Sequence, residues 1–358
     1  MPDRTRQARQ IGPKNEGEAM QRRTVLRGLA ASALLAGLKV NAAQEPGPKV
    51  IRVNIPGPHL LPFIPIELIS KLGIDQALGV QLAIRYLPSG ILALEDALAG
   101  NAQFAGVAFS ALPAFIAKGK PVSAIAVLSR GVPPYSVLIR PDLAGVVRSL
   151  NDLKGRSIGI PMGSVTAKTY LQVMLELWLA NHGVRSNEVR WAQTNQNLAG
   201  MQGSLVSGMV DAVFCEEPLA GTLVRKKIGL RLASLSDPDA PVRTGWANHI
   251  RAVLACPRDI VERQPQQVEL MTAMLKRSLR WMQLKKPDDI VAKLGVEDAE
   301  LSQDLADPIK RIPNLFSSDG RFKAEEVEAS RQFLAETGTT LPAGMNIRGL
   351  IADKWVNR

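Results

Sequence analysis

Small polar residues precede three of the helices that the sequence predicts. They lie in three short loops, 88–90 (PSG), 109–110 (FS) and 161–166 (PMGSVT), and each loop follows a short strand-like run. In open parallel sheets, ligands bind outside the carboxyl ends of the strands. Free backbone N–H groups and the helix dipole favour an anionic or polar group there. N-capping explains each serine or threonine taken alone, so the prediction of a ligand site depends on the loops converging on one cleft.

The histidines give no metal or nucleotide signature. His59, His182 and His249 are isolated in the sequence, and no Cys, His, Asp or Glu cluster has metal-ligand spacing. His59 lies in a strand-to-helix loop where it could line a cleft, whereas His182 precedes Gly183 at a predicted helix end. Residues 159–169 lack both the Gly-Lys-Ser/Thr ending of a P-loop and the GxGxxG spacing of a dinucleotide fold. We therefore predict no metal and no cofactor.

Cys215 and Cys256 are the two cysteines of the chain. Cys215 precedes Glu216-Glu217-Pro218 and could act as a nucleophile beside a carboxylate. A buried thiol next to an acidic turn that opens a helix explains the same letters. A chain of this size does not need a disulfide, so we expect two buried free thiols. Because a buried thiol is not a nucleophile, we expect no enzymatic activity.

Short β-branched runs alternate with helical patterns along residues 50–233. This alternation is typical of βαβ units, and it predicts an α/β fold with mostly parallel strands between layers of helices. The pattern restarts near residue 150, which indicates two similar halves. The expected strands are 50–55, 82–87, 103–107, 122–128, 157–160, 189–192, 210–214 and 230–233, and the expected helices are 60–72, 91–99, 111–118, 167–182, 198–206 and 219–227.

The C-terminal part is mainly helical. After a strand at 250–255, helices are expected at 265–285, 288–294, 298–307 and 324–336. The first of these carries an apolar stripe that must be buried, and packing it on the first half would do so. That arrangement gives two lobes joined by crossings near 137–140 and 248–255, with a hinge and a cleft. The predicted division is 44–140 and 248–358 for the first lobe and 141–247 for the second.

Residues 1–43 resemble an export signal. Arg22-Arg23 precede an apolar run at 28–38, and the small residues Val40, Ala42 and Ala43 follow. Eleven apolar residues are too few to span a bilayer. The paired arginines resemble a twin-arginine signal, and an ordinary secretory signal is the alternative. Either signal predicts a periplasmic protein.

The positive charge does not indicate a nucleic-acid-binding protein. The formal net charge is +11, of which +5 belongs to residues 1–43. The remaining basic clusters adjoin apolar helical runs instead of alternating with aromatic residues. We therefore expect a solvated surface and no nucleic-acid partner.

Four segments carry a family resemblance. In chain order they are 62–66 (PFIPI), 94–106 (LEDALAGNAQFAG), 153–164 (LKGRSIGIPMGS) and 205–218 (LVSGMVDAVFCEEP). Together they resemble the nitrate/sulfonate/taurine group of ABC-transporter solute-binding proteins, which is related to the thiamine-pyrimidine-precursor group. Gln103 replaces a usual acidic residue, and Cys215 stands where an aromatic residue is common.

The resemblance implies a type II periplasmic-binding-protein fold. It further implies a monomeric substrate-binding component of an ABC importer, which captures a small organic anion (sulfonate-, nitrate- or taurine-like) or a related polar solute and presents it to a membrane permease. Two alternatives remain. One is an enzyme on the same fold, desulfinase-like or related to pyrimidine-precursor synthesis, with Cys215 or His59 reactive; the other is a periplasmic sensor or adaptor. Carried over onto this sequence, the ligand-binding residues are Pro58, His59, Ser89, Gly90, Phe109, Ser110, Gly163, Ser164, Val165, Thr166, Glu216 and Glu217.

Overall fold

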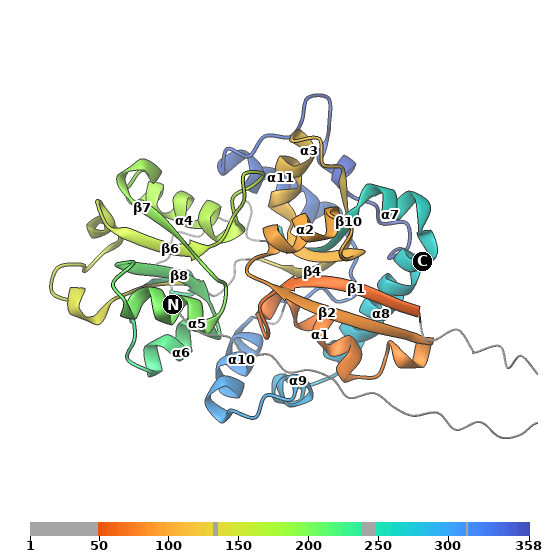
Figure 1. Cartoon of the computed structure of the whole chain (residues 1–358), viewed down its shortest axis with the longest axis horizontal. Helices are drawn as coiled ribbons and strands as arrows, with labels where there is room; N and C mark the ends of the chain where they lie inside the picture. Colours follow the sequence, from red (N-terminus) through yellow and green to blue (C-terminus); the bar gives the residue numbers. More distant parts are fainter. Residues whose placement is uncertain (1–48, 132–134, 238–247, 313) are drawn as a thin grey trace, which may run out of the picture. The chain divides into compact units, whose positions relative to one another are not determined.

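Two five-stranded sheets organise the part of the chain that the computed structural model describes, residues 49–131, 135–237, 248–312 and 314–358 (Figure 1). The predicted export signal lies outside these residues. The first sheet has the order β2 (Val80–Leu87), β1 (Lys49–Pro56), β3 (Phe104–Ala108), β10 (Ile250–Pro257), β4 (Val122–Arg130). The second has the order β7 (Arg190–Thr194), β6 (Ser157–Pro161), β8 (Ala212–Glu216), β5 (Tyr135–Ile139), β9 (Leu230–Ser234).

Both sheets have the same mixed pairing. β1 pairs in parallel with β2 and β3, while β10 is antiparallel to β3 and β4. In the second sheet β6 pairs in parallel with β7 and β8, while β5 is antiparallel to β8 and β9. One strand of each sheet is therefore reversed. That strand is the one by which the chain arrives from the other sheet.

The two reversed strands mark the crossings between the sheets. The chain leaves the first sheet after β4 and enters the second with β5; it returns from β9 to β10. β5 falls before the predicted division at residue 140, yet it pairs in the second sheet. We therefore propose a division between β4 and β5. Each sheet with the helices packed on it is called a lobe below.

Most predicted helices of the two halves are present, with shifted ends. Thr169 caps α4, since its hydroxyl accepts a hydrogen bond from the Gln172 N–H at 3.3 Å. This helix starts three residues later than predicted, so the loop at 163–166 does not open it directly. Gly183, with φ of 72°, follows the helix in the left-handed conformation. The α-helices of this part are α1 (Ile64–Lys71), α2 (Gly90–Leu98), α3 (Leu112–Ala117), α4 (Tyr170–Asn181), α5 (Leu198–Val206) and α6 (Leu219–Arg225). Short 3-10 helices occupy Leu61–Phe63, Gln76–Leu78, Phe109–Ala111, Pro141–Leu143, Leu150–Leu153, Ser186–Glu188 and Ile347–Leu350.

The C-terminal helices pack on the first sheet, as the apolar stripe predicts. α8 contacts α1 and β4, and the Ser278 hydroxyl donates to the Pro65 carbonyl at 2.6 Å. The stripe Val268, Met271, Leu275, Leu279 and Met282 is buried. α7 was not expected, because its sequence, RDIVER, is mostly polar. The helices are α7 (Arg258–Arg263), α8 (Pro265–Gln283), α9 (Pro287–Leu294), α10 (Ala299–Arg311) and α11 (Ala324–Glu336).

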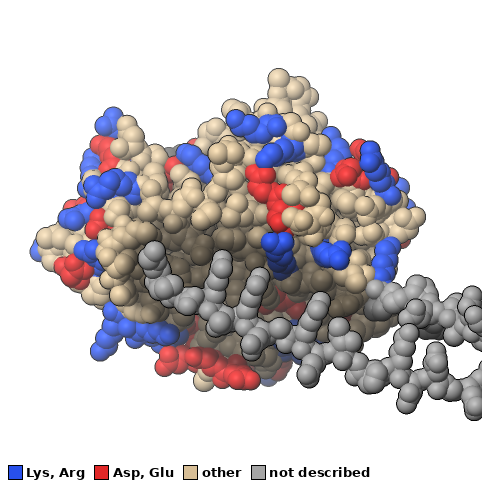
Figure 2. All heavy atoms as spheres, in the orientation of Figure 1, with Lys and Arg blue, Asp and Glu red and all other residues tan. Residues whose placement is uncertain are grey.

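The surface and core agree with a globular fold. Lysines and arginines are interspersed with acidic residues on the face shown in Figure 2. Cys215 and Cys256 are buried free thiols, which confirms that prediction. Within the described ranges, the helices lack the combination of length and apolar character that a membrane span requires.

Candidate functional site

A small cavity is lined by residues of both lobes. The volume of this cavity is about 40 Å³, enough for very few waters. Its apolar lining comes from Pro56, Pro62, Phe63, Ile91, Val107 and Leu171, and its polar lining from Tyr135, Thr169, Tyr170, Gln196, Glu216 and Arg251. Gly90, Ala108 and Ala252 complete it. The cavity thus lies at the carboxyl ends of β1, β3 and β8, where the fold predicts a ligand.

A buried ion pair forms the polar centre of this cavity. Arg251 on β10 and Glu216 at the end of β8 are 2% and 1% exposed, and the Arg251 Nη2 contacts Glu216 Oε2. Gln196 Nε2 donates to Glu216 Oε1 at 2.8 Å. Burial raises the pKa of Glu216, and Arg251 and Gln196 oppose that rise. Burial alone would lower the pKa of Arg251, but Tyr135 and Glu216 raise it. This ion pair therefore joins the two lobes, and it is largely excluded from water.

The guanidinium of Arg251 is only partly satisfied by protein groups. Its Nε and Nη2 donate to the Tyr135 hydroxyl at 3.1 and 2.6 Å. Its Nη1 is buried and has no hydrogen-bond partner among the described residues. A buried donor without a partner costs free energy, so an acceptor that reached Nη1 would be bound favourably.

Tyr170 is fixed in the cavity wall by a buried histidine. Its hydroxyl lies 2.9 Å from His249 Nε2, and the His249 ring stacks on Phe333 with centroids 4.3 Å apart. Tyr170 opens α4 in the second lobe, whereas His249 precedes β10 in the first. The lobes are therefore joined at a second point beside the cavity.

Two helices direct their first turns at the cavity. Gly90 and Ile91 open α2, and Tyr170 and Leu171 open α4. Helix N-termini carry partial positive charge, which favours acceptor atoms. Polar residues before both helices were predicted to bind the ligand. Before α4, however, Thr169 lines the cavity, and the loop at 163–166 does not.

Two of the twelve predicted ligand residues, Gly90 and Glu216, line the cavity. Ser89 is buried and caps α2 by accepting from the Leu92 N–H at 3.3 Å. Pro58 is exposed, and the His59 Nδ1 lies 3.0 Å from Glu67 Oε2 on α1. Phe109 is buried against Phe322, and Ser110 is half-buried. None of these five residues lines the cavity in this conformation, and their role in ligand binding stays a prediction.

The predicted loop 163–166 contacts the other lobe instead of the cavity. The Ser164 hydroxyl donates to Glu95 Oε1 at 3.1 Å, and Lys120 Nζ donates to Thr166 Oγ1 at 2.8 Å. Lys120 also pairs with Glu95 Oε2 at 2.6 Å. Val165 is almost fully exposed, and Gly163 packs against the Ala167 carbonyl. In the described conformation this loop forms one rim contact between the lobes.

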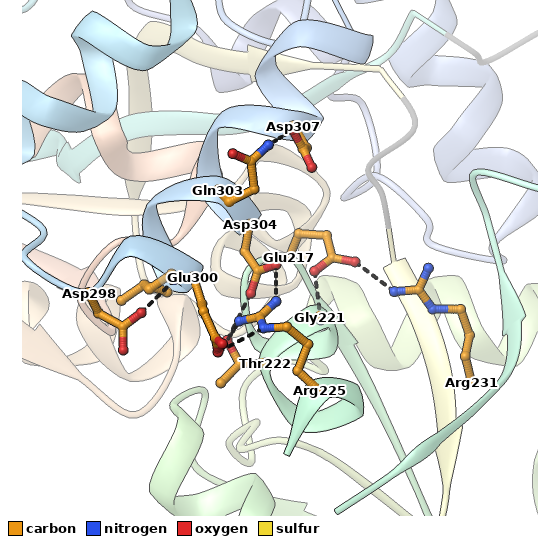
Figure 3. A network of polar contacts seen from close by, with 11 residues as sticks. Glu217, Gly221, Thr222, Arg225, Arg231, Asp298, Glu300, Gln303, Asp304 and Asp307 are labelled. Carbon is orange, nitrogen blue, oxygen red and sulfur yellow. Dashed lines mark hydrogen bonds and ion pairs between the residues drawn. The ribbon is translucent and has the colours of Figure 1, made fainter. Parts of the chain in front are cut away.

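The twelfth predicted residue, Glu217, is bonded within its own lobe and lies beside a second rim contact (Figure 3). Figure 3 shows its carboxylate between Arg231, 3.0 Å away, and the Gly221 N–H, 2.7 Å away. Next to it, Arg225 of α6 pairs with Asp304 and Glu300 of α10, and the Thr222 hydroxyl donates to Asp304 at 3.1 Å. These contacts tie α6 of the second lobe to α10, which packs on α9 and through it on α1.

Glu216 is the one predicted residue in the polar lining of the cavity. Tyr135, Tyr170, Gln196 and Arg251 were not among the predicted ligand residues. The signal was a charged residue, Arg251, inside the apolar strand run IRAVLAC, since a charge in a buried strand requires a partner.

The cysteine next to Glu216 is not placed for chemistry. Cys215 is fully buried, and burial raises the pKa of its thiol well above the ordinary range, which makes it a poor nucleophile. The described residues include no group of three His, Cys, Asp or Glu side chains that could hold a metal ion.

Comparison with known proteins identifies relatives of this architecture. The model of the NMT1-like family matches residues 58–296, more than half of the chain. A protein of Bordetella bronchiseptica has 20% identity and a TM-score of 0.72, with 86% of this chain and 96% of that chain covered. The alkanesulfonate-binding protein SsuA of Xanthomonas axonopodis, bound to MOPS, has 15% identity and a TM-score of 0.60, with 86% and 99% covered. The two-lobed type II periplasmic-binding-protein fold is thereby confirmed.

The same fold also occurs in an enzyme. The desulfurization enzyme DszB has 15% identity and a TM-score of 0.55, with 86% of this chain and 98% of that chain covered. At such identities the likeness shows the fold alone. No curated protein matches this sequence significantly.

Proposed function

The chain belongs to the NMT1-like family, and from this premise we propose that it is the substrate-binding component of an ABC importer. In this proposal the two lobes close over a small polar solute and present it to a membrane permease. The alkanesulfonate-binding protein SsuA, which has the same fold, supports a role in solute binding.

One observation carries this proposal above the others. The cavity is built from both lobes, and its polar groups, Arg251 from the first lobe and Glu216 with Tyr135 from the second, meet across it. A solute that bonds these groups would stabilise the closed state relative to the open one, which is how hinge closure couples to binding.

The residues that line the cavity also favour the binding of a solute over catalysis. Cys215 does not line the cavity, and the His59 side chain faces Glu67. The groups that do line it hold and orient a polar solute against apolar walls, as expected for a binding site.

Export would place the protein where such a receptor works. The segment 1–43 has the basic, apolar and small-residue regions of a signal peptide. We propose that the mature protein acts in the periplasm, with a permease as its partner.

A ligand screen tests this function directly. The mature protein is screened by thermal unfolding against sulfonates, nitrate, amides and small heterocycles. A ligand at 100 times its dissociation constant should add about 2.7 kcal/mol to the free energy of unfolding. Small-angle scattering should then show that the bound form is more compact than the free form. Catalytic turnover of a bound compound, abolished by Cys215→Ala, would refute the receptor function in favour of an enzyme.

A further inference from the structure

The charge balance of the cavity bears on what it binds. Arg251 and Glu216 are its charged lining residues, and they neutralise each other by direct contact. An anion that approached Arg251 would also approach the carboxylate of Glu216 in a site of low polarity, where like charges repel strongly. A net-neutral pair therefore gives a simple anion little net attraction to offset the cost of taking it out of water.

The free hydrogen-bonding capacity of the pair has both signs. Arg251 Nη1 offers a buried donor without a partner among the described residues. Glu216 accepts one bond at each oxygen, from Gln196 and from Arg251. A carboxylate has about four acceptor sites, so two remain for a ligand donor. Between them the two side chains therefore have an unused donor and unused acceptor sites.

The remaining residues that line the cavity suit an uncharged ligand that is partly apolar. Phe63, Ile91, Val107 and Leu171 present apolar surface. The first turns of α2 and α4 attract an oxygen that carries partial negative charge, and such an oxygen need not be ionised.

Resting on the proposed function, we propose that this cavity selects uncharged ligands with a carbonyl beside an N–H, as in amides, lactams and ureas, and that Glu216 is the residue that excludes simple anions. The ligand carbonyl accepts from Arg251 Nη1, and its N–H donates to Glu216. The hydrocarbon part of the ligand lies against the apolar wall. Such selectivity differs from what the name of the alkanesulfonate-binding protein SsuA indicates for that protein.

Pairs of probes that differ in charge and little in shape test this inference. The mature protein is titrated calorimetrically with two pairs of small probes, acetamide and acetate, and methanesulfonamide and methanesulfonate. The wild type should bind the uncharged member of a pair more tightly. Glu216→Gln keeps an acceptor but removes the negative charge, so it should shift the ratio of affinities toward the anion by about tenfold or more.

A second buried ion pair supplies the matched control. Glu326 on α11 pairs with Arg130 on β4, both are buried, and neither lines the cavity. Glu326→Gln should keep the wild-type preference.

Each outcome decides something. Tighter binding of the anions by the wild type, or an unchanged ratio in a folded Glu216→Gln variant, overturns the inference and leaves the receptor function standing. If Glu216→Gln does not fold, the wild-type preference alone decides the ligand class. Binding of no probe by the wild type overturns the inference, whereas the broader ligand screen decides the receptor function.

Discussion

Arg251 Nη2 on β10 donates to the hydroxyl of Tyr135 on β5 at 2.6 Å, so the two reversed strands of the two sheets are bonded to each other at the cavity. Each strand belongs to one sheet and is reached from the other. The contact therefore joins the lobes next to the segments where the chain crosses between them.

Tyr135→Phe should destabilise the closed state. It removes the acceptor of Arg251 Nε and one of the two acceptors of Nη2, which leaves a buried donor without a partner and costs about 1–3 kcal/mol. Urea unfolding of the wild type and the variant measures this loss. Tyr86→Phe is the comparison, because the Tyr86 side chain is 45% exposed and should lose less. Equal losses of stability in the two variants would show that the hydrogen bonds between Tyr135 and Arg251 contribute no more than the hydroxyl of Tyr86.

The sequence predicts the architecture well because apolar periodicity reports burial. The stripe on α8 is an example: its spacing required a buried face, and the structure packs it on α1 and β4. The helix at Leu198–Val206 was predicted with both ends correct, since Asn197 caps it.

The site was predicted in part, because it depends on which side chains meet in space. The helix N-termini were found from their Ser and Gly residues, and Gly90 lines the cavity as expected. The start of α4 was misplaced, because the apolar pattern continues into Ala167 while the cap is Thr169. Arg251 and Glu216 are 35 residues apart in sequence, so no local pattern reveals their pairing.

Asp211 should give the stability a defined dependence on pH. Burial alone would raise its pKa, but the N–H and hydroxyl of Ser157 donate to it at 2.8 and 2.9 Å and lower the pKa below the ordinary value. A depressed pKa stabilises the fold above the unfolded value of about 3.9, and this contribution is lost as the pH falls through the folded value. Asp211→Asn should therefore cost about 1–3 kcal/mol at neutral pH. The difference from the wild type should shrink in acid.

Urea unfolding at neutral and acidic pH measures this difference. Asp142→Asn serves as control, because its carboxylate is 65% exposed and pairs only at the surface, so its effect should stay within about 0.5 kcal/mol. If the loss of stability in Asp211→Asn does not change with pH, the lowered pKa of Asp211 in the folded protein is refuted.

Gly221→Ala should separate α6 from α10. A Cβ at this position would lie 2.8 Å from Asp304 Oδ1 and 2.9 Å from Glu217 Oε2 (Figure 3), so both carboxylates must move. Alanine in a helix normally stabilises by up to about 1 kcal/mol relative to glycine. We expect that gain to be absent or reversed here. Gly203→Ala on α5, where nothing lies within 4 Å, should show the normal gain. Thermal unfolding of both variants makes the comparison, and equal stabilisation would contradict the close approach.

Lys120→Met should weaken closure without unfolding either lobe. Lys120 contacts Glu95 in its own lobe and Thr166 in the other, and its side chain is 37% exposed. A pair at such a site is worth about 1 kcal/mol or less, which corresponds to a shift of up to about fivefold in the opening equilibrium. The affinity for a cavity ligand should fall by the same factor. Lys118→Met, two residues earlier on an exposed position, should change neither. Similar affinities in both variants and the wild type would show that this rim does not contribute to closure.

Replacing Arg22 and Arg23 with lysine should trap the precursor in the cytoplasm if the leader is a twin-arginine signal. That pathway exports folded proteins and would require the lobes, with their buried Arg251–Glu216 pair, to form before export. An ordinary secretory signal needs only a positive n-region and an apolar run, and lysines preserve both. Fractionation of cells that express the wild type and the double variant distinguishes the two signals. Normal delivery of the variant to the periplasm would leave the ordinary signal, and the lobes would then fold after export.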